Sequence, residues 1–363
     1  MKYTVNQNSD KPLYLQLYEQ LRADIIKQVY PYKSKLPSKR LIADELGVST
    51  ITVEHAYALL CDEGYVESRE RSGCFVIFRT ADYFGAATDM PRTDLKHHHG
   101  ADSSYGFPFS VLAKTMRKII SDCGEEILSR APNKGCLELR EAISAYLFRS
   151  RGITASAEQI IVGSGAEYLY GLIVKLLGKG RIFALESPSY KKIEQVYLDS
   201  GIKYELLPLG SDGIESGSLA GTSADVLHIS PYRSFPTGIT ASASKRYEYI
   251  RWSAVADRYI IEDDFESEFS VSKKPEETLF SHTELANIIY MNTFSKTISP
   301  ALRVGYMVIP RHLVSVFEEK LGFYSCTVPT FEQLVLAELI LSGDFERNIN
   351  RVRRKKRKEL AMK

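Results

Sequence analysis

The chain has 363 residues, of which 44% are hydrophobic and 25% are charged, and its formal net charge at pH 7 is +2. These values are ordinary for a folded globular protein with room for two domains, and they argue against a disordered chain. A net charge this small does not indicate a nucleic-acid partner, so evidence for one has to come from local clusters of basic residues.

Cysteine usage and hydropathy exclude further classes of protein. The five cysteines form no Cys-x-x-Cys pair and have no histidine at ligand spacing, so neither a zinc site nor a disulfide framework is supported. The chain starts without an apolar signal core, and the most apolar stretch, 169–177, is too short to span a bilayer. We therefore expect a cytoplasmic protein with no metal site and no membrane segment.

Helices are predicted first near the start of the chain. The first covers residues 13–27, where apolar residues recur at helical spacing at Leu13, Leu17, Leu21 and Ile25. A second begins at Ser38, whose hydroxyl can cap it, and ends at Gly47. Its apolar residues, which we expect to face inward, are Leu41, Ile42 and Leu46.

A third predicted helix begins after Ser49, which can cap it in the same way. Its apolar face is formed by residues at i, i+3, i+4 and i+7, namely Val53, Ala56, Tyr57 and Leu60. Thr50, Thr52 and His55 are left pointing away from that face. The helix ends at Gly64.

Residues 65–68 and 75–78 are predicted to pair as a hairpin around residues 71–73. Two helices separated by a tight turn and followed by a hairpin form a winged helix-turn-helix, which places one helix in the major groove of DNA. Basic residues gather as phosphate contacts require, at Lys33, Lys35, Lys39 and Arg40. The alternative is a winged helix that makes only protein contacts.

Residues 11–78 also carry a series of short motifs. They are Leu36-Pro37-Ser38-Lys39-Arg40, Leu46-Gly47-Val48-Ser49, Thr52-Val53, Ala56-Tyr57, Glu63-Gly64-Tyr65 and Ser72-Gly73. Together they resemble the GntR family of bacterial regulators, which implies a double-stranded DNA operator as partner. By that resemblance the phosphate-contacting residues are Ser38, Lys39 and Arg40, the groove-facing residues are Ser49, Thr50 and Thr52, and the wing residues are Arg71 and Gly73.

Residues 79–100 lack apolar periodicity and are rich in Gly, Ala, Thr, Asp and Pro, which is typical of a linker. They separate a predicted DNA-binding domain at 1–78 from a second domain at 101–363. The tract His97-His98-His99 lies in this linker. Because no second cluster of ligands accompanies it, we interpret the tract as solvated histidines and not as a metal site.

Beyond the linker, strand-like apolar segments alternate with helical patterns. Strands are predicted at 160–162, 181–185, 226–229, 259–261 and 288–291, and helices at 166–177, 190–199 and 244–257. This alternation predicts an α/β fold with a mostly parallel sheet covered by helices. In such sheets ligands bind beyond the carboxyl ends of the strands, and the polar clusters of this domain each follow a predicted strand.

Lys296 is the most informative residue of the second domain. It follows the strand at 288–291, is flanked by hydroxyl-bearing residues and is followed by Arg303, while Asp263 ends another strand. An amine for a Schiff base, a carboxylate for a pyridine nitrogen and donors for a phosphate are the components of a pyridoxal phosphate site. Each residue alone could be an exposed lysine or an acidic turn residue, but their convergence favours the cofactor.

Two further segments support the same site. Ser164, Gly165 and Ala166 follow a predicted strand and open a helix, so their backbone amides could receive a phosphate. Tyr190 follows another strand, where its ring could stack on a flat cofactor. Taken singly, the glycine could serve only the turn and the tyrosine only the core.

Longer motifs carry a second resemblance. They are Glu186-Ser187-Pro188-Ser189-Tyr190, Phe235-Pro236-Thr237-Gly238, Glu262 through Phe269, and Thr293-Phe294-Ser295-Lys296 through Arg303-Val304-Gly305-Tyr306. With them the second domain resembles the fold-type I aminotransferases. Together with the GntR-like segment, the whole chain is similar to the MocR subfamily of pyridoxal phosphate-dependent transcription regulators.

This resemblance implies a role for each matching residue. Lys296 would form the Schiff base, Asp263 would pair with the ring nitrogen, and Tyr190 would stack on the ring. The residues around the phosphate would be Ser164, Gly165, Ala166, Thr293, Ser295 and Arg303, and an effector carboxylate would meet Lys192. The resemblance also implies a homodimer in which each DNA-binding domain packs over the partner's large domain.

The sequence departs from the family pattern at three places. Phe265 stands where a tyrosine hydroxyl is expected beside the cofactor, and Tyr232-Arg233 replaces a Ser-His pair. The chain ends at Lys363 within a predicted long helix, so we expect the small domain of the fold to be missing from it. The basic run 351–358 in that helix is interpreted as a solvated helix end.

These patterns favour a transcription regulator whose aminotransferase-like domain binds pyridoxal 5'-phosphate and senses an amino compound or the cofactor itself, and they do not favour an enzyme. The alternative is an active aminotransferase with an appended helix-turn-helix, and turnover of an amino acid with a keto acid would distinguish the two. A third reading, a remnant that folds incompletely, stays open because of the expected missing domain.

Overall fold

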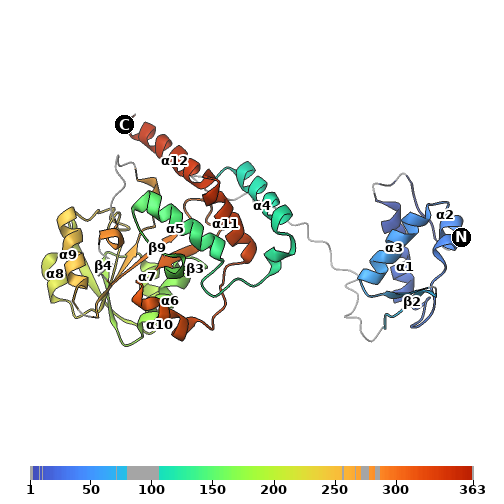
Figure 1. Cartoon of the computed structure of the whole chain (residues 1–363), viewed down its shortest axis with the longest axis horizontal. Helices are drawn as coiled ribbons and strands as arrows, with labels where there is room; N and C mark the ends of the chain where they lie inside the picture. The colour runs from blue at the N-terminus through green and yellow to red at the C-terminus, as the bar shows by residue number, and fades with distance from the viewer. Residues whose placement is uncertain are drawn as a thin grey trace. The chain divides into compact units, whose positions relative to one another are not determined.

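The computed structural model describes residues 3–7, 9, 11–70, 72–79, 106–255, 257–265, 267–270, 278–282 and 287–361. The chain divides into two compact units, Met1–His99 and Gly100–Lys363 (Figure 1). Most of the predicted linker, including the histidines at 97–99, lies outside the described residues. Across the described part of the chain, no helix combines the length and the apolar character needed to cross a bilayer.

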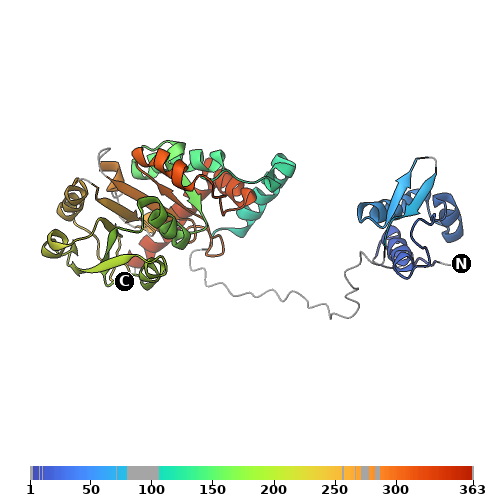
Figure 2. The same ribbon diagram turned by 90° about the horizontal axis from the view of Figure 1, so that it is seen from below.

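The small unit contains the predicted helices and hairpin in the predicted order. Its elements are α1 (Leu13–Ile26), α2 (Lys39–Leu46), α3 (Thr50–Asp62), β1 (Val66–Arg69) and β2 (Gly73–Val76). Figure 2 shows the two strands of the hairpin side by side next to the helices. They pair antiparallel, with Val66 opposite Val76, so β2 lies two residues nearer the turn than predicted.

Hydrogen bonds at the helix ends confirm the predicted caps. The Ser38 hydroxyl accepts from the backbone N–H of Leu41 at 3.2 Å, and the Ser49 hydroxyl accepts from that of Thr52 at 3.1 Å. Gly47 follows α2 with a φ of 63°, a left-handed conformation that glycine adopts without strain. Local chemistry therefore sets the connection between α2 and α3.

The core of the small unit includes the apolar face predicted for α3. Its members, with those of α1, are Leu17, Leu21, Ile25, Val53, Ala56, Tyr57 and Leu60. One prediction was wrong, because Leu41 is 50% exposed whereas Ile42 is 1% exposed. Successive helical residues are turned by about 100°, so Ile42 and Leu46 share the inward face and Leu41 lies outside it.

Within the described residues, an eight-stranded sheet forms the centre of the large unit. Its strands are β3 (Ile160–Gly163), β4 (Ile182–Ser187), β5 (Lys203–Gly210), β6 (Gly213–Ile214), β7 (Val226–Ile229), β8 (Tyr259–Asp263), β9 (Ile288–Thr293) and β10 (Gly305–Val308). The order is β3-β10-β9-β8-β7-β4-β5-β6. The five strands from β9 to β5 run parallel, while β10 and β6 are antiparallel to their neighbours. The predicted mostly parallel α/β sheet is confirmed.

Helices cover both faces of this sheet (Figure 1). One face carries α4 (Phe109–Cys123), α5 (Leu137–Arg151), α11 (Thr330–Leu341) and α12 (Asp344–Ala361) over β3, β10 and β9, and α8 (Ser216–Gly221) and α9 (Ala243–Ser253) over the strands beyond. The other face carries α6 (Ala166–Leu177), α7 (Lys191–Asp199) and α10 (His312–Leu321). Residues of β9 alternate between the two cores, since Ile289 faces α6 and Tyr290 faces α5.

Candidate cofactor site and nucleic-acid interface

The predicted cofactor residues lie at one edge of the large sheet. β10 runs back between β3 and β9, so Gly305 pairs with Gly163 at the end of β3 and with Thr293 at the end of β9. Arg303 comes two residues before β10 and therefore lies near the segments that follow both strands. Asp263 ends β8, the strand next to β9. The sheet topology thus gathers residues from distant parts of the sequence.

Asp263 is buried between a tyrosine of α6 and a histidine of β7. Its Oδ2 accepts a hydrogen bond from the Tyr170 hydroxyl of α6 at 2.5 Å and lies 3.5 Å from Nε2 of His228 on β7. His228 is held in turn by the hydroxyl of Tyr197, 2.7 Å from its Nδ1. Burial, followed by the charge of Asp263, raises the pKa of Tyr170 and keeps its hydroxyl protonated as a donor. Sequence reasoning missed all three supporting residues.

The Oδ1 atom of Asp263 is buried and has no hydrogen-bond partner. Leaving a buried carboxylate oxygen unpaired costs free energy, and a ring with a protonated pyridine nitrogen would bring the missing donor. Lys296 lies in the turn after β9, with its Nζ 4.5 Å from the centroid of the Phe265 ring. Phe265 follows Asp263 by two residues, so amine and carboxylate belong to one region. The residues present therefore fit pyridoxal phosphate.

The predicted phosphate-binding segment adjoins the guanidinium of Arg303. Gly165 has a φ of 94°, and a Cβ added there would lie 3.1 Å from Arg303 Nη2. The backbone N–H of Ser164 donates to the Thr327 hydroxyl at 3.2 Å, and α6 begins at Ala166. The structure thus brings these predicted residues together and adds Thr327, which the sequence analysis missed.

Thr293 is the last residue of β9, and Ser295 lies in the connection that leads from β9 toward β10. The backbone N–H of Thr293 donates to Oδ1 of Asn292 at 2.6 Å, and the Ser295 hydroxyl donates to the carbonyl of Leu302 at 3.4 Å. Both predicted residues therefore belong to the same sheet edge as Arg303.

Tyr190 and Lys192 stand at the start of α7. Tyr190 is 40% exposed, and its ring meets that of Phe235 edge to face, with 5.5 Å between centroids. The amine of Lys192 lies 3.1 Å from Oε1 of Glu167, and the hydrogen bond to Glu167 raises the pKa of Lys192. Glu167 also accepts from Arg303 through its other oxygen, at 3.0 Å. This acidic partner of two predicted cations was not foreseen.

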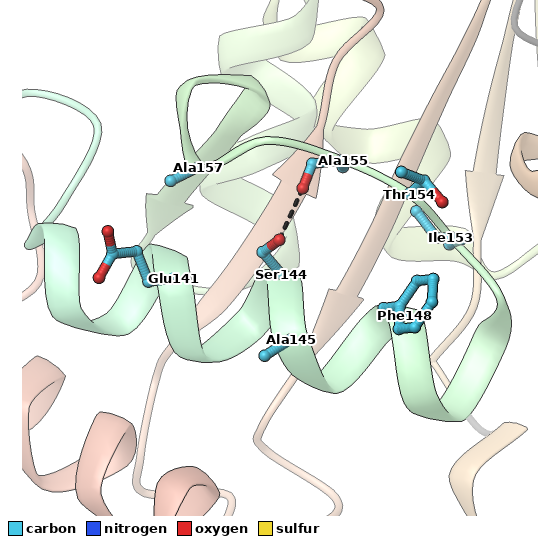
Figure 3. A pocket seen from close by; sticks show the side chains of 8 residues that line it. All are labelled: Glu141, Ser144, Ala145, Phe148, Ile153, Thr154, Ala155 and Ala157. Atoms are coloured by element: carbon cyan, nitrogen blue, oxygen red, sulfur yellow. Dashed lines mark hydrogen bonds between the residues drawn. The ribbon is translucent and has the colours of Figure 1, made fainter.

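The described residues of the large unit line at least two cavities. A groove of about 670 Å³ runs between α6 and α7 and is lined by residues that include Glu167 and Lys192. The second, of about 410 Å³, lies between α5 and residues 153–157, where the Ser144 hydroxyl donates to the Ala155 carbonyl at 2.6 Å (Figure 3). None of the predicted cofactor residues lines the second cavity, so it lies apart from the candidate site.

Behind the site, on the opposite face of the sheet, lies a group of buried charges. Asp264 lies 3.2 Å from Nε of Arg151 and accepts from the Tyr290 hydroxyl at 2.7 Å. Burial alone would lower the pKa of Arg151, but the charge of Asp264 raises it well above its ordinary value. Burial also raises the pKa of three glutamates to about 7, namely Glu186, Glu262 and Glu268. Asp263 and Asp264 are adjacent at the end of β8 but face opposite sides of the sheet. Asp263 lies in the candidate site, and Asp264 lies among these buried charges.

The residues predicted to contact DNA lie around the start of α2 and α3. Arg40 and Thr50 are exposed, and Lys39 lies 3.4 Å from Glu54 of α3. The Ser38 and Ser49 hydroxyls are the two caps described above, and the hydroxyls of Ser49 and Thr52 lie 2.9 Å apart.

The structure describes only part of the predicted wing. Gly73 has a φ of 103°, a backbone conformation that residues with a side chain rarely adopt, so glycine is favoured at this position. Arg71, the other predicted wing residue, lies outside the described residues.

Comparison with protein families identifies both parts of the chain. Residues 13–76 match the family described as "Bacterial regulatory proteins, gntR family", and residues 103–362 match "Aminotransferase class I and II". The uncharacterized HTH-type transcriptional regulator YdeL of Bacillus subtilis is 32% identical over 99% of this chain and 80% of its own length. The probable rhizopine catabolism regulatory protein MocR of Rhizobium meliloti is 28% identical over 96% of this chain and 76% of its own length.

Solved structures give the same fold for the large unit. Kynurenine aminotransferase from Pyrococcus horikoshii aligns with a TM-score of 0.62 and 25% identity, over 68% of this chain. The alignment spans 64% of that aminotransferase, less than two thirds of its length.

Proposed function

We propose a function from the premise that this chain belongs to the MocR-like family of HTH-type transcriptional regulators, in which a GntR segment precedes an aminotransferase class I and II segment. The chain regulates transcription by binding double-stranded operator DNA through its small unit. Its large unit binds pyridoxal 5'-phosphate and senses a small amino compound or the cofactor itself. It acts in the cytoplasm.

The observation that carries this proposal is the environment of Asp263. A buried carboxylate with one open oxygen stands at the same sheet edge as a lysine amine and an arginine guanidinium. Buried carboxylate oxygens normally have hydrogen-bond partners, and the neighbouring Asp264, which also has one open oxygen, is compensated by the guanidinium of Arg151. The open oxygen of Asp263 therefore supports a ligand that supplies its own donor.

Each residue of the site has a proposed task. When bound, pyridoxal phosphate supplies an aldehyde for a lysine amine and an electron-withdrawing ring. Lys296 provides the amine, Asp263 accepts from the ring nitrogen, and Tyr190 covers a face of the ring. The phosphate is held by Ser164, Gly165, Ala166, Thr293, Ser295 and Arg303, and the effector carboxylate is bound by Lys192.

The small unit has a matching division of labour. Ser38, Lys39 and Arg40 contact phosphates, and these contacts make the affinity depend on salt. Ser49, Thr50 and Thr52 present the start of α3 to the major groove, while Arg71 and Gly73 form the wing.

We place the domain boundaries at 1–78 and 101–363, with a linker at 79–100. The regulator is a homodimer in which each DNA-binding unit packs over the partner's large unit, as the family resemblance implies. An effector then acts by binding two arrangements of these units unequally, because equal affinity for both would shift nothing.

Absorbance spectroscopy tests the cofactor part of the proposal. The purified chain with pyridoxal 5'-phosphate is expected to show a visible band, and borohydride should fix the cofactor covalently at Lys296. Lys296→Ala should lose the band almost completely. The control is Lys191→Ala, which replaces an exposed lysine of α7 and should retain the band. A band that persists in Lys296→Ala, with no adduct at Lys296 in the parent, would overturn the assignment.

A working aminotransferase is the second candidate, and the match to aminotransferase class I and II favours keeping it in view. Sustained conversion of an amino acid and a keto acid over many turnovers, abolished by Lys296→Ala, would establish the enzyme reading. Phe265 argues against it, since this position offers the cofactor no hydroxyl.

A further inference from the structure

Glu167 pairs with both cations of the proposed function, namely the phosphate-binding Arg303 and the effector-binding Lys192. Its Oε2 accepts from Arg303 Nη2 at 3.0 Å, and its Oε1 lies 3.1 Å from the amine of Lys192. Arg303 comes from the segment before β10 and Lys192 from the first turn of α7. One carboxylate therefore bridges the proposed phosphate ligand and the proposed effector ligand.

The position of Glu167 in the fold is one where an anion is favoured. It is the second residue of α6, and the positive end of a helix and its unpaired N–H groups attract negative charge. The guanidinium of Arg303 lies close to Gly165, which precedes α6, because a Cβ added at Gly165 would lie 3.1 Å from Arg303 Nη2. The proposed function places a phosphate at the start of α6, next to Arg303. In the structure the carboxylate of Glu167 accepts a hydrogen bond from Arg303 at this place.

We propose that Glu167 is an internal counter-anion that a phosphate must displace from Arg303, so that this residue sets the affinity of the site for phosphorylated ligands. The inference rests on the proposed cofactor site and deepens it. It gives a specific role to a residue that neither the motifs nor the family resemblance marked.

The contacts make such a displacement feasible. The side chains of Arg303, Glu167 and Lys192 are 52%, 43% and 55% exposed, and ion pairs so open to water are weak. A phosphate can take the guanidinium through two parallel hydrogen bonds, which a single carboxylate oxygen does not match. The groove between α6 and α7, which Glu167 and Lys192 both line, offers the displaced carboxylate room beside Lys192.

The negative charge of Glu167 remains next to the phosphate after displacement and should weaken phosphate binding measurably. A carboxylate next to a phosphate dianion repels it, and the carboxylate also competes for Arg303. Replacing Glu167 by glutamine keeps the size of the side chain and removes both effects. We expect Glu167→Gln to bind pyridoxal 5'-phosphate roughly fivefold more tightly than the parent, the scale set by exposed charge pairs.

Titration of the full chain with two ligands tests the inference. Dissociation constants for pyridoxal 5'-phosphate and for pyridoxal, which lacks the phosphate, are measured by absorbance in the parent and in Glu167→Gln. The variant should gain affinity for the phosphorylated ligand alone. Glu141→Gln, which removes an exposed charge from α5 beside the second cavity, is the matched control and should change neither constant.

The outcomes separate this inference from the proposed function. Binding of pyridoxal 5'-phosphate by the parent, with no gain in Glu167→Gln or with an equal gain for pyridoxal, overturns only the role of Glu167. Failure of the parent and both variants to bind either ligand, with circular dichroism showing folded protein, overturns the cofactor site and this inference together.

Discussion

The caps of α2 and α3 and the polar groups of the candidate site are satisfied over very different distances along the chain. In the small unit the Ser49 hydroxyl accepts from an N–H three residues away, and the Ser38 hydroxyl does the same. In the large unit Asp263 is held by Tyr170, which is 93 residues away, and Asp264 is paired with Arg151. The starts of α2 and α3 therefore depend on local capping, although Tyr18 and Glu63 join distant parts of the small unit, whereas the candidate site depends on the whole sheet being assembled.

This difference affects how substitutions should be interpreted. A cap can be lost without disturbing distant residues, and its cost is about 1 kcal/mol. A buried pair that joins a helix to a strand end cannot lose one partner without leaving the other charge unpaired in the interior. The following predictions test whether the two units differ in this way.

The largest effect is expected from Arg151→Ala. The side chains of Arg151 and Asp264 are 5% and 1% exposed, so the substitution strands a buried carboxylate and should lower the free energy of unfolding of the large unit by about 3–5 kcal/mol. Urea unfolding followed by the fluorescence of Trp252, the single tryptophan of the chain, reports on this unit.

Arg149→Ala is the matched control, because Arg149 lies on the same helix and pairs with Glu346 at the surface, with side chains 49% and 35% exposed. It should cost no more than about 1 kcal/mol. Equal losses of unfolding free energy in the two variants would show that the buried pair of Arg151 and Asp264 does not stabilise the large unit as we describe.

The next effect is a pH dependence of the stability of the large unit. Burial raises the pKa of Glu186 from 4.5 to about 7. The folded state therefore binds a proton that the unfolded state releases between these values. Stability from this group is complete below pH 4.5 and is lost as the pH rises through 7, by at most about 3 kcal/mol.

Glu186→Gln should make the Trp252-detected unfolding free energy less dependent on pH between about 5 and 8. Glutamine can still accept the hydrogen bond that the Ser234 hydroxyl donates to Glu186 at 2.7 Å. Stability of the parent that rises with pH over this window, or a slope unchanged in the variant, would contradict the prediction.

The smallest effects are expected in the small unit. Ser49→Ala removes the cap of α3 and should cost about 1 kcal/mol of stability, seen as faster hydrogen–deuterium exchange in residues 50–62.

Arg40→Ala should leave that exchange unchanged, because Arg40 is exposed. It should instead weaken binding to a random-sequence duplex and lower the salt slope by about one unit. A cap variant with unchanged exchange, or an Arg40 variant with an unchanged salt slope, would remove the distinction.

Much of the small unit could be predicted because its signals are local. Ser38, Gly47 and Ser49 mark helix ends by chemistry within one turn, and the apolar face of α3 follows from helical spacing. The error at Leu41 came from a short helix in which three apolar residues compete for one inward face, and only the packing against α3 shows which of them is excluded.

The sequence by itself determined the type of the large unit and the ends of the strands that carry its polar residues, because apolar runs of strand length and the residues that follow them are contiguous. Tertiary structure alone decided that β10 returns antiparallel between β3 and β9 and so brings Arg303 to Gly165. It also decided that Glu167 bridges Arg303 and Lys192, and that the Tyr170 hydroxyl donates to Asp263 with His228 beside it. Such contacts join residues far apart along the chain, and no local spacing encodes them, since they exist only once the strands have taken their order in the sheet.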